Sequence, residues 1–185
     1  VNTMVRMTRW LTVFAAALNS LLLVVKARFL SPHEFGYIAV ILIVIGLFHV
    51  LENLGISQAI IQRDEISRKE RSSLFCFNII LAFFMLGFIY ITAPFIAAFF
   101  SLPELKVYLP VAALVFLATS PCLLFKAFLQ KQMYFKQLSL IEILKYVIVL
   151  AATTWFLFRG LGVMGVVYGQ IAGAVFTAIS IIAVT

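Results

Sequence analysis

Cysteine is scarce in this sequence, and its scarcity argues against a fold held together by disulfides. The chain has two cysteines, Cys76 and Cys122. Both stand inside long apolar runs, where a thiol usually acts as a small buried hydrophobic group. Small disulfide-rich domains carry a larger set of cysteines in a short chain. We therefore expect both cysteines to be buried in the membrane part of the protein.

The residue groups that build common catalytic and metal sites are also missing. The two histidines, His33 and His49, stand sixteen positions apart with no cysteine near either one. The sequence therefore shows no set of metal ligands. It also shows no glycine-rich phosphate-binding loop and no G-x-S-x-G motif. The polar segments are too short to hold much of an active site. We expect a protein that is not an enzyme and that holds no metal or cofactor.

Acidic residues are few, with 7 against 14 lysines and arginines, which gives a net charge of +7. Such an excess in a soluble protein would suggest nucleic-acid binding. Here the cations stand in short segments between apolar runs, and no patch interleaves aromatic and basic residues. We expect them to set the membrane topology and to contact anionic headgroups, not nucleic acid.

Apolar residues are what the sequence has in excess. They make up 64% of the chain, with a mean hydropathy of +1.14, against about 45–50% in a soluble domain. They form six runs, each long enough to cross a hydrocarbon core of about 30 Å. We predict an all-α polytopic membrane protein, a bundle of six transmembrane helices that begins with an uncleaved span. The predicted spans are residues 10–29, 36–61, 74–100, 108–130, 138–158 and 163–184.

The distribution of cations between the predicted spans indicates an orientation. One side of the membrane receives Arg6, Arg9, Arg63, Arg68, Lys69, Arg71, Lys131 and Lys136. The other side receives Arg28, Lys106 and Arg159. By the positive-inside rule the first side is cytoplasmic. Both termini are then predicted to be cytoplasmic, and residues 62–73 form the longest loop.

The segment between the first two runs contains a helix start signal. Ser31 precedes Pro32, and Glu34 follows three positions after Ser31. Serine at the cap, proline at the first helical position and glutamate at the third form a capping box. The second helix is therefore predicted to begin near Pro32.

Three polar residues of the first run are candidates for substrate binding. Asn19 and Lys26 stand seven positions apart, which is nearly two helical turns, so they share one stripe. Arg28 follows near the end of the run. A charge at membrane depth costs about 2.5–3.5 kcal/mol and usually faces a partner or a wet cavity. These residues are therefore candidates for the wall of a polar cavity. The alternative is that Lys26 and Arg28 extend to the membrane interface.

The second run carries a further polar group near its middle. His49 and Asn53 stand four positions apart, and Glu52 is adjacent to their stripe. Asn53 is a fourth candidate for the cavity. An imidazole and a carboxyl one turn apart can exchange a proton when burial moves their pKa values. His49 and Glu52 are therefore candidates for energy coupling, and a hydrogen-bonded helix contact is the alternative.

The polar residues of the later runs favour structural interpretations. Glu142 and Lys145 are expected to pair with each other or to lie among headgroups. Lys126 and Gln130 are expected to extend to the interface, and Gln170 is expected to join two helices.

Three glycines of the last run, Gly165, Gly169 and Gly173, are spaced by four and line one helix face. Small residues at this spacing let helix backbones approach closely. They are predicted to form a packing face. A helix of the same chain is the favoured partner, and a second copy is the alternative.

Two stretches of the sequence carry a family resemblance. The first combines R-F-L-S-P-H-E-F-G-Y-I-A-V at 28–40 with L-E-N-L-G-I-S-Q-A-I-I-Q-R at 51–63. The second is P-C-L-L-F-K-A-F-L-Q-K-Q-M-Y-F-K-Q-L-S at 121–139. In order and spacing they resemble the polysaccharide-repeat-unit flippases of the Wzx type. These belong to the multidrug/oligosaccharidyl-lipid/polysaccharide exporter superfamily.

The resemblance implies a transporter of two six-helix lobes around a central, often cationic cavity. It implies a bacterial inner-membrane protein that moves an oligosaccharide on undecaprenyl pyrophosphate to the outer leaflet by alternating access. Lys26 and Arg28 would then be the cations that attract phosphate. The implied partners are the lipid-linked oligosaccharide and the bilayer, with a polysaccharide polymerase and chain-length proteins as further partners.

The six predicted spans are about half the number that the family has. We therefore expect the chain, residues 1–185, to be an N-terminal lobe of a longer transporter. Three alternatives stay open at this point. A multidrug or cation antiporter would need an acidic membrane cluster, for which Glu52 is the only deep candidate. A polysaccharide polymerase or glycosyltransferase would need a large outer loop. A half-length membrane scaffold would need no transport site.

Overall fold

The part of the chain that the structure describes is residues 2–53, 68–131 and 135–184 of a computed structural model. These residues form six α-helices and no β-strand, which confirms the all-α prediction. The helices are α1 (Asn2–Phe29), α2 (Pro32–Asn53), α4 (Arg68–Phe99), α5 (Leu105–Lys131), α6 (Phe135–Phe158) and α7 (Gly162–Val184).

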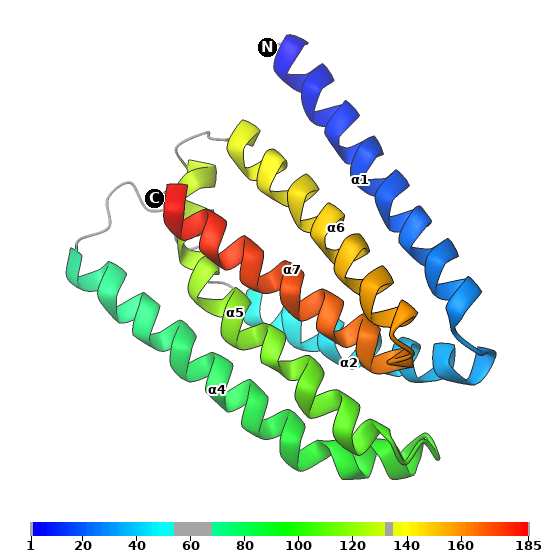
Figure 1. Cartoon of the computed structure of the whole chain (residues 1–185). Coiled ribbons are helices and arrows are strands. Elements are labelled where there is room, and N and C mark those ends of the chain that lie inside the picture. The colour runs from blue at the N-terminus through cyan, green and yellow to red at the C-terminus, as the bar shows by residue number, and fades with distance from the viewer. Residues whose placement is uncertain (1, 54–67, 132–134, 185) are drawn as a thin grey trace.

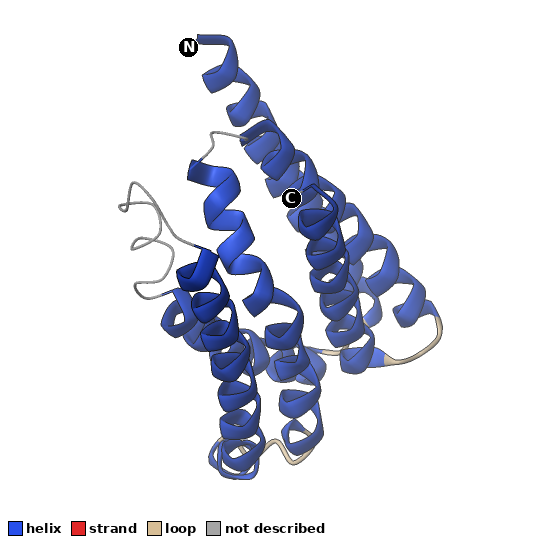
Figure 2. Cartoon of the chain, turned by 90° about the vertical axis from the view of Figure 1, so that its left-hand side faces the viewer, coloured by secondary structure: helices blue, strands red, loops and turns tan. Residues whose placement is uncertain are grey.

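The helices form two antiparallel hairpins that pack side by side. α4 pairs with α5, α6 pairs with α7, and α5 packs along α7 to join the hairpins (Figure 1). α1 lies at one edge against α6, and α2 contacts α5 and α7. The turns that follow α1, α4 and α6 lie at one end of the bundle (Figure 2). The described chain ends, Asn2 and Val184, lie toward the opposite end (Figure 1).

Several helices are longer than the apolar runs that predict them. α1 begins at Asn2 instead of residue 10, and α4 begins at Arg68, so the prediction of a loop over residues 68–73 is wrong. Arginine, lysine and glutamate are good helix formers, and they can extend a membrane helix into the polar region without breaking its backbone hydrogen bonds. The predicted end of the second span, residues 54–61, lies outside the described residues.

The capping box at the start of α2 is confirmed. The backbone N–H of Ser31 donates to Glu34 Oε2 at 2.7 Å, and the backbone N–H of Glu34 donates to Ser31 Oγ at 3.3 Å. This exchange satisfies two N–H groups that a helix start leaves without intrahelical partners. The chain therefore reverses direction between α1 and α2 within two residues.

Four of the described helices are long and apolar enough to cross a membrane. Their spanning segments are Pro32–Val50, Ser73–Phe99, Gln137–Phe158 and Gly162–Ala183. The apolar segment of α5, Leu105–Ser120, is shorter. Large apolar side chains point away from the bundle, among them Phe95 and Phe99 of α4, which are 72% and 82% exposed. An apolar surface of this kind suits lipid and not water. The protein is a multi-pass membrane protein.

The apolar interior is divided into two clusters. The larger cluster joins α2, α4, α5 and α7 toward the end with the three turns, and it includes the fully buried Leu105, Leu109 and Phe116. The smaller cluster lies toward the other end and contains Cys122, Leu129, Ile141 and Ile181. The interior is therefore interrupted about halfway along α5 and α7. Cys122, in the smaller cluster, is buried as predicted, whereas the prediction is wrong for Cys76, which is exposed on α4.

The glycine stripe of α7 faces α6 of the same chain. A Cβ atom built on Gly165 would lie 3.0 Å from Phe156 Cβ, and one on Gly169 would lie 3.0 Å from the backbone nitrogen of Thr153. A Cβ on Gly173 would contact the side chain of Val149. The absence of side chains at these positions lets the two helices approach closely.

We expect Gly169→Leu to destabilise the bundle, because the new side chain would meet the backbone of α6. Overpacking of this kind typically costs about 1–3 kcal/mol. Gly87→Leu is the matched control, since a Cβ at Gly87 on α4 has nothing within 4 Å. Thermal unfolding of the detergent-solubilised variants, followed by size-exclusion chromatography, measures the difference. Equal melting temperatures would contradict the packing role of the glycine stripe.

Candidate functional site

A cavity of about 430 Å³ occupies the interruption between the two apolar clusters. It lies between α2, α5, α6 and α7 and is hereafter called the polar cavity. Its walls are formed by His49, Val115, Ala118, Thr119, Cys122, Leu123, Lys126, Gln130, Lys145, Gln170, Ala174, Thr177 and Ile181. More than half of these residues have polar side chains, so the cavity suits a hydrated or charged ligand.

The polar residues reach the cavity because they repeat at helical spacing. On α5, Thr119, Cys122, Lys126 and Gln130 are separated by three or four positions, which places them on one face of the helix. α7 contributes Gln170 and Thr177, which are seven positions apart, and α6 contributes Lys145. The polar faces of α5 and α7 and the single lysine of α6 therefore point into the same space.

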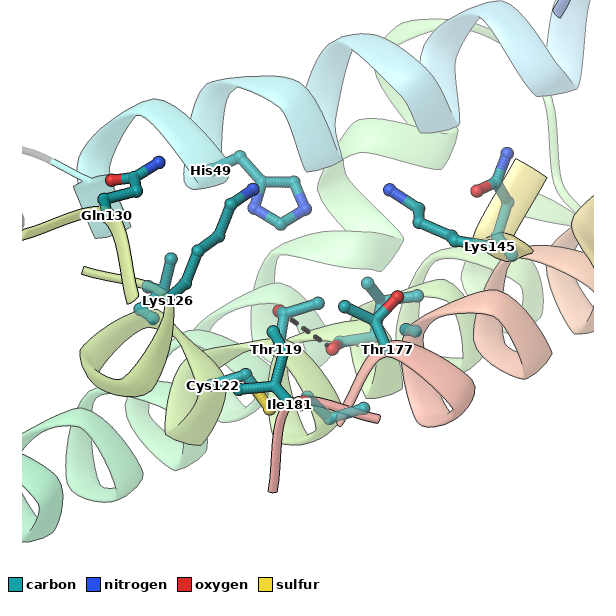
Figure 3. Close-up of a pocket in the computed structure, with 13 residues that line it drawn as sticks. His49, Thr119, Cys122, Lys126, Gln130, Lys145, Thr177 and Ile181 are labelled. Atoms are coloured by element: carbon teal, nitrogen blue, oxygen red, sulfur yellow. Dashed lines mark hydrogen bonds between the residues drawn. The ribbon is translucent and has the colours of Figure 1, made fainter. Parts of the chain in front are cut away.

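His49 stands where α2 meets the cavity. Its imidazole packs on the ring of Phe116 with a centroid separation of 5.0 Å. Phe116 is fully buried in the larger apolar cluster, so the imidazole stands at the border between that cluster and the polar cavity. The side chains of Lys126 and Lys145 extend from α5 and α6 toward the space beside His49 (Figure 3). Basic side chains of three helices therefore converge there.

The hydroxyl and thiol groups of the cavity already donate to their own helices. Thr119 Oγ1 donates to the carbonyl of Val115 at 3.0 Å, and Thr177 Oγ1 donates to the carbonyl of Gly173 at 2.8 Å. Cys122 Sγ makes the same kind of contact one turn back along α5. The charged donors of the cavity are the ammonium groups of Lys126 and Lys145, and the amides of Gln130 and Gln170 add neutral donors. This set favours a ligand rich in acceptor oxygens.

One carboxylate lies beside the two lysines. A small cavity of about 40 Å³ shares Lys126, Lys145 and Thr177 with the polar cavity, and Glu142 is the carboxylate in its wall. Lys145 is within electrostatic reach of both Glu142 and Lys126, and its Nζ lies 5.4 Å from the centre of the Tyr146 ring. Two ammonium groups face one carboxylate, so the described lining keeps a positive excess.

The residues predicted from the sequence are distributed unevenly around this cavity. His49 forms part of its wall. On α1, Asn19 and Arg28 are exposed and Lys26 is buried with 8% of its surface exposed. None of these three lines the polar cavity. Glu52 and Asn53 belong to the last turn of α2, and their side chains lie outside the described residues.

Four polar residues of the cavity were not assigned to a site from the sequence. Lys126, Gln130, Lys145 and Gln170 were interpreted as interfacial, paired or structural residues, whereas the structure turns them into one space. The spacing of Thr119, Lys126 and Gln130 could have indicated a polar face on α5. The contribution of α6 and α7 could not be inferred from one helix at a time.

Residues 25–185 match the family model described as polysaccharide biosynthesis protein. The lipopolysaccharide biosynthesis protein WzxC of Escherichia coli (strain K12) is 30% identical over 131 residues, which cover 71% of this chain and 27% of the relative. An uncharacterised membrane protein in the cps region of Klebsiella pneumoniae is 31% identical over 77% of this chain and 30% of its own length.

A third relative is the teichuronic acid biosynthesis protein TuaB of Bacillus subtilis (strain 168), which is 31% identical over 54% of this chain and 20% of its own length. The chain thus spans 20% to 30% of these curated relatives. No solved structure matches the chain. The family resemblance predicted from the two sequence stretches is confirmed. The chain belongs to the family of polysaccharide biosynthesis proteins that includes Wzx-type proteins.

Proposed function

We propose that the full-length protein flips a lipid-linked oligosaccharide, carried on undecaprenyl pyrophosphate, from the cytoplasmic to the outer leaflet by alternating access. In this proposal the chain forms the N-terminal lobe, residues 1–185, of a two-lobe transporter in the bacterial inner membrane. The protein acts as a transporter and not as an enzyme.

The observation that carries the proposal is the convergence of Lys126, Lys145 and His49 on a cavity inside a membrane bundle. Lys145 belongs to the spanning segment Gln137–Phe158 and nevertheless turns into the cavity wall, which favours a functional role. A diphosphate and its sugars cannot cross hydrocarbon without replacement of their hydration. Ammonium groups replace the water around phosphate oxygens, and amides and hydroxyl oxygens do so around sugar hydroxyls.

The position of the cavity suits a substrate that is assembled in the cytoplasm. Most of the lining of the polar cavity comes from the second half of α5, the first half of α6 and the second half of α7. It therefore lies toward the end of the bundle that carries the chain ends. The positive-inside rule predicts that this end is cytoplasmic. In this orientation the cavity receives the substrate from the inner leaflet.

The other candidates from the sequence keep proposed roles in the transport cycle. His49 and Glu52 are proposed to couple transport to an ion gradient, because His49 stands in the wall of the cavity where the substrate is proposed to bind. Lys26, Arg28, Asn19 and Asn53 are proposed to contact the substrate elsewhere along its path. A polysaccharide polymerase and chain-length proteins are proposed to receive the product.

An antiporter of the same superfamily is less well supported by the described residues. Export of a cationic drug in exchange for a cation is expected to use acidic groups in the membrane interior. The described wall of the polar cavity instead carries two lysines and no carboxylate, and Glu142 lines only the small adjacent cavity. The charge of the site thus favours an anionic substrate.

Deletion of the gene tests the proposal through the location of the lipid-linked repeat unit. We expect loss of surface polysaccharide and accumulation of the repeat unit on the cytoplasmic leaflet. There it is protected from a membrane-impermeant glycosidase or periodate added to spheroplasts. The measurement is the fraction of lipid-linked sugar that is degraded before and after the membrane is permeabilised.

The alternatives predict different outcomes of the same experiment. Loss of a polymerase would leave single repeat units exposed on the outer leaflet, where the added reagent degrades them. Loss of a drug antiporter would leave the polysaccharide unchanged and alter drug sensitivity. Either result would overturn the flippase proposal.

A further inference from the structure

A second cavity, hereafter the apolar cavity, lies between α2, α5 and α7 and has a volume of about 210 Å³. Ile41 and Ile45 of α2 form one wall, and Val166 and Val167 of α7 form another. The only polar side chains in its lining are those of His49 and Gln170, which stand at one end. Water in most of this space would lack the two to four polar partners that it needs, so a hydrocarbon occupant suits it better.

The polar cavity and the apolar cavity adjoin each other and share part of their walls. His49, Val115 and Gln170 each contribute to both of them. A ligand that spans this junction would have charged oxygens near Lys126 and Lys145 and hydrocarbon between α2 and α7. The arrangement matches an amphiphile whose anionic headgroup is joined directly to an apolar chain.

The apolar cavity also reaches the surface of the bundle. Gly46 of α2 belongs to its lining and is exposed, and a Cβ atom built on it would have nothing within 4 Å. Around it, Ile43 and Leu47 of α2 are 66% and 60% exposed, as expected for a surface that faces lipid. A chain could therefore enter the bilayer past Gly46 while its headgroup stays between the helices.

We propose that the apolar cavity holds the first isoprenoid segment of the lipid carrier, with the diphosphate of the same molecule beside Lys126 and Lys145. This assignment rests on the proposed function, because it requires a polyprenyl-diphosphate substrate. It adds a binding subsite for the tail and a lateral exit at Gly46. The exit lets the headgroup leave the interface without withdrawing the whole tail from the bilayer.

The test compares two probes on the full-length protein in phospholipid nanodiscs. Inorganic pyrophosphate contains only the headgroup, and geranyl pyrophosphate adds two isoprene units. We expect the wild-type protein to bind geranyl pyrophosphate at least tenfold more tightly than pyrophosphate. Gly46→Phe fills the apolar cavity from its open side, so we expect it to remove that advantage and to leave the affinity for pyrophosphate unchanged.

Gly87→Phe is the matched control. Gly87 lies on the exposed face of α4, a Cβ there also has nothing within 4 Å, and it lines neither cavity. Partition of geranyl pyrophosphate into the bilayer is the same for both variants, so a difference between them reports on the apolar cavity. A Gly87→Phe protein that keeps the tenfold advantage supports the assignment.

The outcomes separate the tail subsite from the proposed function. A Gly46→Phe protein that keeps the full advantage of geranyl pyrophosphate would overturn the tail subsite while the headgroup site stands. If a phospholipid chain fills the apolar cavity, geranyl pyrophosphate will show no advantage in nanodiscs, and the tail subsite is again overturned. A wild-type protein that binds neither probe would overturn the headgroup site itself.

Discussion

Simultaneous replacement of Lys126 and Lys145 by glutamine will abolish polysaccharide export. Both ammonium groups face the polar cavity, and the described cavity wall contains no other lysine or arginine. A hydrogen bond to a charged group contributes about 1.5–3 kcal/mol. Two such bonds correspond to about 3–6 kcal/mol, and because about 1.4 kcal/mol is a factor of ten, pyrophosphate affinity should fall at least about 100-fold. Calorimetry on the full-length protein measures the affinity, and complementation of a deletion strain measures export.

Two control proteins make this prediction specific. Lys106→Gln with Arg159→Gln removes the same number of charges from exposed positions outside the polar cavity, and we expect it to keep export. Lys126→Arg with Lys145→Arg keeps the charges, and we expect it to keep most of the pyrophosphate affinity. If the first control loses as much affinity as the double glutamine variant, net charge and not the cavity explains the effect.

A third variant compares the cations of the polar cavity with Lys26 and Arg28 of α1. Lys26→Gln with Arg28→Gln removes the pair that the family resemblance singles out, and neither residue lines the polar cavity. We expect pyrophosphate binding to persist in this protein if the headgroup first binds in the polar cavity. Export that fails without a loss of pyrophosphate affinity would assign Lys26 and Arg28 to a later step of transport. Unchanged export would remove them from the proposed substrate path.

The sequence predicts the elements of this fold because each prediction depends on local physics. Apolar runs locate the helices since the bilayer core has a fixed thickness. The Ser31–Glu34 capping box places the start of α2 at Pro32, where the structure has it. The start of α4 was missed because the charged residues 68–71 have good helix propensity although they are polar. Hydropathy alone cannot separate a polar helix extension from a loop.

The candidate site was harder to predict because it depends on contacts between helices. His49 was found because a histidine in the middle of an apolar run is conspicuous. Lys126 and Lys145 were not, because each stands near the end of its run, where a lysine can extend to the interface at little cost. Only the packing of α5 against α7, and of α7 against α6, brings the two lysines into one cavity. The direction of a side chain at a helix end depends on how the helices pack against one another.

A tethered carboxylate in the polar cavity will also block export. Thr177 lines both the polar cavity and the small cavity beside Lys126 and Lys145. Thr177→Asp therefore places a fixed anion where the diphosphate is proposed to bind. An anion that belongs to the protein competes with the substrate at a very high effective concentration. We expect export to fall more than tenfold, with a matching loss of pyrophosphate affinity in calorimetry.

Thr177→Asn separates the charge of the new side chain from its shape. Both substitutions remove the hydroxyl that donates to the carbonyl of Gly173 at 2.8 Å, and asparagine has nearly the size of aspartate. If the lysines form the anion site, the asparagine protein keeps export and pyrophosphate binding while the aspartate protein loses both. The aspartate protein should also unfold at a higher temperature than the asparagine protein, because its carboxylate gains two cationic neighbours. Equal export by the two proteins would show that the charge of the polar cavity does not select the substrate.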